Sequence, residues 1–163
     1  MNSYFEGKTV IVTGASAGVG AACARAFAAA GSNLVLAARG QAGLDLMAAE
    51  LSTEVKVLTV VMDVRNTDQC MELIEKANAE FGQIDILINN AGLHNRGDVT
   101  SVNSGDIGAM VDINLRAPLI LSSAVLPFIR LSRGGAIVMI GSLAGMAPLQ
   151  GAATYSATKA GLR

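Results

Sequence analysis

Short apolar runs alternate with longer segments of helical character along the whole chain. Glycine, asparagine, aspartate and serine, which favour turns, separate these segments. Strands that alternate with helices in this way are typical of βαβ units and a parallel sheet. The pattern predicts strands at Lys8–Thr13, Asn33–Ala38, Glu54–Met62, Asp85–Asn89 and Ala136–Ile140, and helices at Gly18–Ala30, Gln41–Leu51, Thr67–Phe81, Ser104 to about Arg130, and from Ala153 to Arg163.

The predicted fold class is α/β. Because βαβ crossovers are right-handed, we expect a doubly wound, Rossmann-like parallel sheet between two layers of helices. No linker or internal repeat interrupts the pattern, so residues 1–163 are interpreted as one domain. Hydrophobic residues make up 52% of the chain and charged residues only 15%, which suits strands that are buried on both faces.

Composition and charge argue against several classes of partner. The net charge is −1, there is no basic run and there is no tryptophan, so we expect no nucleic-acid partner. The N-terminus lacks the apolar block of a signal peptide, and the most apolar window, Ala117–Ile129, is too short to span a membrane. Cys23 and Cys70 stand alone, which predicts no disulfide framework, no metal site and a reducing, cytoplasmic location.

A glycine-rich stretch, Thr13–Gly20, joins the first predicted strand to the first predicted helix. Gly14 suits a tight turn, Gly18 allows backbone to approach a phosphate, and Gly20 allows the helix to pack closely on its strand. The unpaired N–H groups and the dipole of the first helical turn attract an anion. We interpret the stretch as a phosphate-binding turn for a dinucleotide.

Glycine or polar side chains follow each of the predicted strands. These residues are Gly14, Arg39, Asp63, Asn90 and Ser142. In a wound parallel sheet, ligands bind at the carboxyl ends of the strands, where the strand order reverses. We therefore expect these residues to lie around one binding site.

Tyr155 and Lys159 are four residues apart and share one face of the last predicted helix. A free tyrosine titrates near pH ~10, and a neighbouring ammonium favours its phenolate form. The pair can therefore act as a general acid and base, although a solvated helix pair without function has the same spacing. Ser142 precedes the helix and can donate a hydrogen bond to a substrate oxygen, or can simply be a turn serine.

The order of these motifs resembles the short-chain dehydrogenase/reductase family along the whole chain. The resemblance rests on Thr13-Gly-x-x-x-Gly-x-Gly, Asn89-Asn90-Ala91-Gly92, Asn114, Ser142 and Tyr155-x-x-x-Lys159. It implies an NAD(P)-binding domain with catalytic residues Asn114, Ser142, Tyr155 and Lys159. The cofactor-binding residues that it implies are Gly14, Ser16, Ala17, Gly18, Val19, Gly20, Arg39, Asp63, Val64, Asn90, Ala91, Gly92, Tyr155 and Lys159.

By the same resemblance, Lys159 also holds the nicotinamide ribose, Asn114 helps to hold a water in a proton relay, and Asp63 contacts the adenine. An exposed helical asparagine and a helix-capping aspartate are the structural alternatives for Asn114 and Asp63. Arg39 stands where an acidic residue would bind the ribose of NAD, so NADP(H) is favoured over NAD(H). Ala17 departs from the pattern, since many NADP-dependent members carry a basic residue there.

The resemblance implies an oxidoreductase that interconverts an alcohol and a carbonyl by hydride transfer, with a small alcohol or ketone as its substrate. A catalytically inactive dinucleotide-binding fragment or regulatory protein is the alternative. A hydrolase motif does not fit Gly141-Ser142, His94 is expected at the surface, and the glycine spacing disfavours the sugar-nucleotide epimerase branch. The chain resembles a subunit without its C-terminal third, and full-length members form dimers or tetramers.

Overall fold

The computed structural model describes residues 4–98, 100–132, 134–147 and 149–163. Its strands are β1 (Thr9–Thr13), β2 (Asn33–Ala38), β3 (Val57–Val61), β4 (Ile86–Asn89) and β5 (Ala136–Met139). Its helices are α1 (Gly18–Ala29), α2 (Gln41–Leu51), α3 (Thr67–Phe81), α4 (Ser104–Val111), the π-helical turn η1 (Asp112–Arg116), α5 (Ala117–Leu131), the 3-10 turn η2 (Leu143–Gly145) and α6 (Ala153–Ala160).

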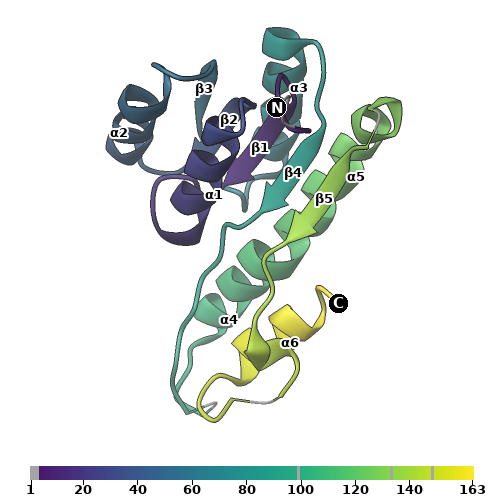
Figure 1. Cartoon of the computed structure of the whole chain (residues 1–163). Coiled ribbons are helices and arrows are strands. Elements are labelled where there is room, and N and C mark those ends of the chain that lie inside the picture. Colours follow the sequence, from purple (N-terminus) through teal and green to yellow (C-terminus); the bar gives the residue numbers. More distant parts are fainter. Residues whose placement is uncertain (1–3, 99, 133, 148) are drawn as a thin grey trace.

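The strands form one parallel sheet in the order β3-β2-β1-β4-β5 (Figure 1). β1 pairs with β2 from Thr9 opposite Asn33, and with β4 from Val10 opposite Ile86. The chain therefore runs outward from β1 to β3, returns to the centre, and continues outward through β4 and β5. The strand order reverses between β1 and β4, and this is the switch point of a doubly wound sheet.

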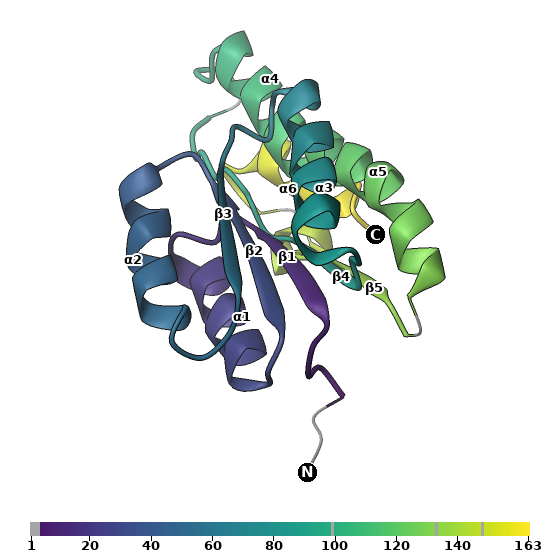
Figure 2. The ribbon, with the colours of Figure 1, turned by 90° about the horizontal axis from the view of Figure 1, so that it is seen from above.

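Helices cover both faces of the sheet, as the alternating pattern predicts. Seen from above, α1 and α2 lie on one face while α3 and α5 lie on the other (Figure 2). α6 lies below the sheet in Figure 1, beside the lower half of the long helix that contains α4. The predicted three-layer α/β architecture is confirmed.

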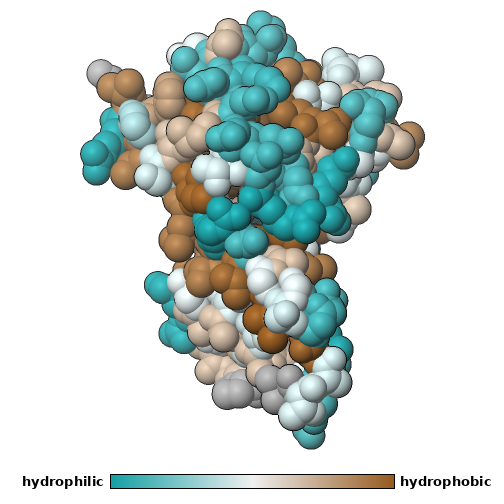
Figure 3. Space-filling model, turned by 180° about the vertical axis from the view of Figure 1, so that it is seen from behind, coloured by the Kyte–Doolittle hydropathy of each residue, from teal (hydrophilic) through white to brown (hydrophobic). Residues whose placement is uncertain are grey.

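The surface is unevenly polar. Seen from behind, polar side chains dominate the upper half of the molecule, and strongly apolar ones form a band across its middle (Figure 3). The segment between β5 and α6 also exposes large apolar side chains, with Leu143 84% and Met146 68% exposed. The part of the chain around α6 therefore presents apolar surface close to the carboxyl ends of the strands.

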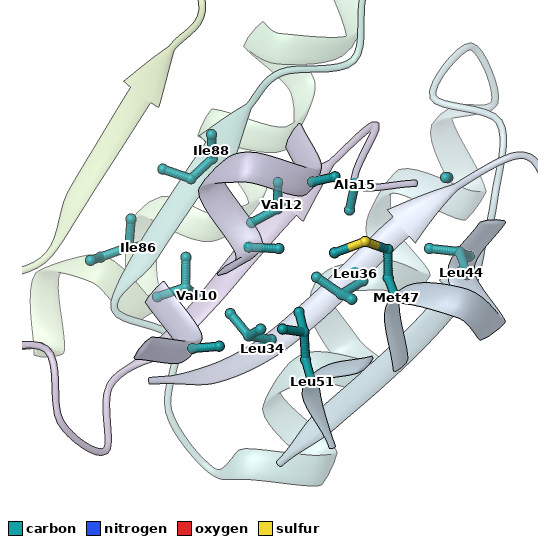
Figure 4. Close-up of a cluster of buried hydrophobic side chains, with 14 residues drawn as sticks. Val10, Val12, Ala15, Leu34, Leu36, Leu44, Met47, Leu51, Ile86 and Ile88 are labelled. Carbon is teal, nitrogen blue, oxygen red and sulfur yellow. The ribbon is translucent and has the colours of Figure 1, made fainter. Parts of the chain in front are cut away.

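Alternation along the strands divides the core into two clusters. Val10 and Val12 of β1 face α1 and α2 together with Leu34 and Leu36 of β2 (Figure 4). Ile11, between them, faces α3 and α5 on the opposite side of the sheet. Because successive strand residues point to opposite faces and both faces are covered, the strands read as continuous apolar runs.

Two predicted boundaries differ from the structure. β3 begins at Val57 rather than Glu54, because the N–H groups of Glu54 and Val55 still donate to the carbonyl of Leu51 at the end of α2. α6 ends at Ala160 rather than Arg163. The remaining predicted strands and helices agree with the structure to within a residue.

The predicted long helix is continuous from Ser104 to Leu131, with the π-helical turn η1 in its middle. By length and composition alone this 28-residue helix would be able to cross a membrane. The short length of the apolar window Ala117–Ile129 therefore does not by itself exclude a membrane span. In this fold, Leu121 and Val125 are buried in the cluster that α5 forms with α3 and the sheet. The helix is a core element of the α/β domain.

The turn between β1 and α1 depends on two glycines. Gly14 has φ +64°, a left-handed conformation that favours glycine, and a Cβ there would lie 2.9 Å from Nδ2 of Asn90. A Cβ on Gly20 would collide with the carbonyl oxygen of Gly14 and lie 2.5 Å from Nδ2 of Asn90. α1 can therefore approach the strand ends this closely only because position 20 has no side chain.

A methyl group at this contact should destabilise the fold. We expect Gly20→Ala to lower the free energy of unfolding by about 1–3 kcal/mol, since a crowded methyl forces backbone shifts. Gly108→Ala is the matched control, because Gly108 lies on the exposed face of α4 with no atom near its Cβ position. That change should stabilise the helix by roughly 0.5–1 kcal/mol. Urea unfolding of both variants checks the expectation, and equal midpoints for the two would contradict it.

Candidate active site

A groove of about 250 Å³ opens at the switch point between β1 and β4. Residues from the ends of four strands meet there, and its far wall comes from the π-helical turn. The lining residues are Gly14, Ser16, Ala37, Ala38, Arg39, Gly40, Met62, Asp63, Val64, Ala91, Gly92, Leu93 and Ile113. Half of the residues that the sequence predicts to bind the cofactor therefore line this groove. The other seven do not line it: Ala17, Gly18, Val19, Gly20, Asn90, Tyr155 and Lys159.

Hydrogen bonds between Thr13 and Asn90 join the two strand ends on either side of the switch point. The hydroxyl of Thr13 accepts from the backbone N–H groups of Asn90 and Ala91, both at 3.0 Å, and donates to the carbonyl of Ile88 at 3.3 Å. The amide Nδ2 of Asn90 donates to the carbonyls of Thr13, at 2.8 Å, and Gly14, at 3.2 Å. We call this set of bonds the Thr13–Asn90 lock.

The N-terminus of α1 differs from those of α3 and α4. Asn66 and Asn103 cap α3 and α4 with their side chains, whereas Ala17 gives α1 no side-chain cap. Gly18, at the start of α1, has no atom within 4 Å of its Cβ position. The first N–H groups of α1 are therefore available to an anion, which the helix dipole also attracts.

At the other end of the groove, Arg39 is exposed and Asp63 is already hydrogen-bonded to Arg65. The guanidinium of Arg65 lies 2.6 Å from the carboxylate of Asp63, and the backbone N–H of Arg65 donates to it at 2.9 Å. These bonds hold the pKa of the Asp63 carboxyl below its usual range, with a smaller contribution from Arg39. The helix cap of α3 is Asn66, so Asp63 does not have the capping role considered as its alternative.

Asn114 lies in the π-helical turn and is fully buried. Its amide exchanges two hydrogen bonds of 2.8 Å with the backbone N–H and C=O of Leu93, and it donates to the hydroxyl of Thr158 at 3.2 Å. The exposed-asparagine alternative is therefore wrong. The Asn114 side chain connects the loop after β4 to α6. Pro118, at the start of α5, has no N–H to donate to a carbonyl of the π-helical turn.

Tyr155 and Lys159 lie on one face of α6, as their spacing predicts. The Nζ atom of Lys159 is 5.9 Å from the centroid of the Tyr155 ring and donates to the carbonyl of Ile140 at 2.7 Å. A Cβ on Gly92, in the wall of the groove, would lie 3.9 Å from the same Nζ. Lys159 is only 6% exposed, and burial lowers the pKa of its ammonium.

Ser142 lies at the end of β5 and lines a second hollow, of about 340 Å³, together with Lys159. Its hydroxyl oxygen accepts from the N–H of Ala144 at 3.1 Å, which begins the 3-10 turn η2. This is the turn-serine geometry, but the hydroxyl hydrogen is still available to a substrate oxygen. The structure thus places Ser142 beside Lys159 on the same side of the sheet end.

Sequence reasoning missed several contacts at this site. His94 is exposed, as expected, but its ring lies against Tyr155 with centroids 4.3 Å apart. Arg116 links η1 to the turn after β3, donating to the carbonyl of Arg65 at 2.8 Å and to the hydroxyl of Thr67 at 3.2 Å. No spacing along the chain signals these contacts, because each joins segments that are distant in sequence.

A larger hollow, of about 610 Å³, lies at the opposite end of the sheet. It surrounds the start of β1 and β4, where the buried carboxylate of Asp85 accepts from the backbone N–H of Thr9 and from the hydroxyl of Ser132. These are the amino ends of the strands. Parallel α/β sheets bind ligands at the carboxyl ends, so we place the functional site at the smaller groove.

Comparisons with known proteins agree with this geometry. The family described as short chain dehydrogenase matches residues 8–163. Ketoacyl reductase HetN from Nostoc sp. is 39% identical over 157 residues, which are 96% of this chain and 55% of HetN. The 3-oxoacyl-[acyl-carrier-protein] reductase FabG from Escherichia coli is 35% identical over 158 residues, which are 97% of this chain and 64% of FabG.

A solved structure also resembles the chain along most of its length. The structure of a short-chain alcohol dehydrogenase from Sinorhizobium meliloti superposes with a TM-score of 0.91 and 32% identity, covering 96% of this chain and 63% of that one. The chain therefore belongs to the short-chain dehydrogenase family, whose members are oxidoreductases that generally use NAD(P)(H). It spans between about half and two thirds of the length of these relatives.

The buried ammonium of Lys159 should make stability depend on pH. Because its pKa is lower in the folded chain than in the unfolded chain, the unfolded chain binds more protons in the interval between the two values. The free energy of unfolding should therefore rise as the pH rises through that interval, just below the ordinary lysine pKa. Lys159→Met should remove this rise, whereas Lys76→Met, an exposed control on α3, should keep it. Parallel profiles for the wild type and Lys159→Met in urea unfolding would contradict the assignment.

Proposed function

We propose that the protein is an NAD(P)(H)-dependent oxidoreductase that interconverts an alcohol and a carbonyl compound, with Tyr155 as the general acid and base. The observation that carries the proposal is the position of buried Lys159. Its ammonium lies 5.9 Å from the centroid of the Tyr155 ring and 3.9 Å from the Cβ position of Gly92, which is in the groove wall. This position supports the proposal that the Tyr155 phenol exchanges protons with a substrate beside a bound dinucleotide.

The residues around the groove fit a dinucleotide. The uncapped N-terminus of α1 and the open position at Gly18 suit a pyrophosphate, and Gly92 leaves room beside Lys159 for the ribose next to the nicotinamide. Asp63 and Val64 would contact the adenine end. When bound, the cofactor supplies or accepts the hydride.

In the direction of reduction, the Tyr155 hydroxyl gives its proton to the carbonyl oxygen of the substrate as negative charge develops there. The Ser142 hydroxyl donates a hydrogen bond to the same oxygen. The Lys159 ammonium stabilises the phenolate that remains, since it lies close to the ring and is screened little by water. In the direction of oxidation, the phenolate takes the proton of the alcohol.

Asn114 fixes the geometry around this proton transfer. The amide of Asn114 holds the loop after β4 against α6. The backbone around Asn114 is π-helical, so it does not follow the regular hydrogen-bond pattern of an α-helix. We infer that this backbone helps to hold the water through which Lys159 exchanges protons with solvent. The role is that of a relay and positioning residue.

Arg39 supports a preference for NADP(H) over NAD(H). It lies at the end of β2 in the groove wall, is exposed, and has Ala37 and Ala38 rather than an acidic residue before it. A guanidinium at this position can pair with a ribose phosphate, whereas NAD recognition needs a carboxylate.

We propose that the protein works in the cytoplasm, because Cys23 and Cys70 stand alone in the sequence and do not form a disulfide with each other. The proposed assembly is a homo-oligomer of the full-length chain through the helix that contains α5, where Leu119 is 54% exposed. An apolar side chain that is exposed to solvent in a single subunit can be buried against a second copy of the chain.

Replacing the phenol tests the proposed reaction. We expect Tyr155→Phe to lower kcat for ketone reduction by at least about 10²-fold, the usual contribution of general acid catalysis, while NADPH still binds. Tyr4→Phe is the control, because Tyr4 donates to the carbonyl of Gly134 at the other end of the molecule. Stopped-flow rates and NADPH fluorescence give the two readouts. Near-normal turnover in Tyr155→Phe would refute the assignment, and NADPH binding without wild-type turnover of any alcohol or ketone would favour a regulatory dinucleotide-binding protein.

Replacing the arginine tests the cofactor preference. A charge-assisted hydrogen bond contributes roughly 1.5–3 kcal/mol, so Arg39→Ala should weaken NADPH binding about 10- to 100-fold. NADH binding should change little, because NADH has no phosphate at that ribose. Arg25→Ala, which removes an exposed guanidinium paired with Glu50, is the matched control. Equal losses of NADPH and NADH affinity in Arg39→Ala would contradict the role.

A further inference from the structure

His94 is the only histidine of the chain, and the proposed reaction does not use it. Its imidazole lies against the Tyr155 phenol with ring centroids 4.3 Å apart and planes inclined by 53°. Tyr155 is half-buried and His94 is exposed, so solvent and small molecules can reach this pair of rings. A substrate whose carbonyl binds the Tyr155 hydroxyl therefore has the imidazole of His94 nearby.

The backbone on both sides of His94 is held in place. Leu93 exchanges two hydrogen bonds with the buried amide of Asn114, and the N–H of Gly97 donates to the carbonyl of Gly151 at 2.9 Å. Gly151 belongs to the segment that leads into α6, which carries Tyr155. The loop from Leu93 to Gly97 is thus tied at both ends to the elements that position the phenol.

A positive charge lies near the phenol. The Lys159 ammonium lies 5.9 Å from the ring centroid, and Gly134–Arg163 contains no aspartate or glutamate. On the His94 loop, Arg96 is exposed, and the carboxylate of Asp98 accepts from the N–H and hydroxyl of Thr100 at 2.9 and 2.7 Å. A negatively charged group is favoured in such surroundings.

The imidazole also needs a hydrogen-bond partner when a substrate covers it. In either protonation state it has at least one N–H donor, and burying a donor without an acceptor is unfavourable by roughly 1–3 kcal/mol. A purely aliphatic substrate would leave this donor unpaired. A carboxylate close to the reacting carbonyl would satisfy the donor and the positive surroundings together.

We propose that His94 is a specificity-determining residue, which donates a hydrogen bond to a carboxylate separated by a short spacer from the carbonyl that the enzyme reduces. The substrate class is therefore a short oxo acid. This inference rests on the proposed function, because it assumes that the carbonyl binds at Tyr155. Because the ring centroids of His94 and Tyr155 are 4.3 Å apart, the carboxylate and the carbonyl that the two rings would bind can be separated only by a short spacer.

A matched pair of ketones tests the proposal in the full-length chain with NADPH. Acetoacetate and isobutyl methyl ketone have nearly the same shape, but an isopropyl group replaces the carboxylate in the second. We expect kcat/KM to favour acetoacetate by at least about 10-fold in the wild type, because a site with a buried polar donor rejects the analogue that leaves it unpaired.

Two variants separate hydrogen bonding from ring packing. His94→Phe keeps a ring against Tyr155 but has no N–H, so the preference for acetoacetate should fall by about 10-fold or more. His94→Gln retains an N–H donor and should restore part of the preference. Lys76→Gln, which removes a distant exposed cation, should leave it unchanged. An unchanged preference in His94→Phe would show that the imidazole only packs on the phenol, and would overturn the proposal.

A measurement without turnover keeps the two proposals distinct. The imidazole resonance in the proton NMR spectrum can be assigned by its loss in His94→Phe. We expect it to shift on addition of acetoacetate and to stay in place with isobutyl methyl ketone. A shift without reduction of either ketone would support the role of His94 in binding and contradict proton transfer from Tyr155 to the bound carbonyl. No shift with acetoacetate would contradict the role of His94, whether or not the ketones are reduced.

Discussion

The Thr13–Asn90 lock is the interaction on which the rest of the site depends. It joins the ends of two adjacent parallel strands at the point where the strand order reverses, and the groups that its bonds connect are buried or partly buried. A net contribution of about 1 kcal/mol for each such bond is enough to fix the relative position of two strand ends. Because Asn90 also contacts Gly14, the same bonds set the path of the turn that leads into α1. The open N-terminus of α1 follows from this turn.

The second half of the site is positioned by the π-helical turn and Asn114. Asn114 is bonded to the loop after β4 and to Thr158 of α6, so one buried amide places both His94 and Tyr155. Lys159 is held by a hydrogen bond to the carbonyl of Ile140, the residue that follows β5. The proposed catalytic groups therefore do not depend on one flexible segment. They are carried by three elements, which are bonded to one another through polar groups at the carboxyl ends of the strands.

Much of this arrangement could be predicted from the sequence because it depends on local patterns. Continuous apolar runs predict strands buried on both faces, and Gly14 and Gly20 predict a strand-to-helix turn with close packing. The spacing of Tyr155 and Lys159 predicts a shared helix face. The π-helical turn could not be predicted, since Pro118 alone does not distinguish it from a regular first turn of a helix. Other contacts depend on tertiary placement, which periodicity does not encode. These are the pairing of Asp63 with Arg65, the hydrogen bonds of Asn114 and the contact of His94 with Tyr155.

A crystal structure of the full-length protein grown with NADPH is the most direct test of the central claim, which is that the groove at the switch point is the dinucleotide site. The account predicts the pyrophosphate at the N-terminus of α1, the phosphate of the adenosine ribose beside Arg39, and the nicotinamide beside Tyr155 and Lys159. A dinucleotide bound instead in the large hollow around Asp85, at the amino ends of the strands, would contradict it.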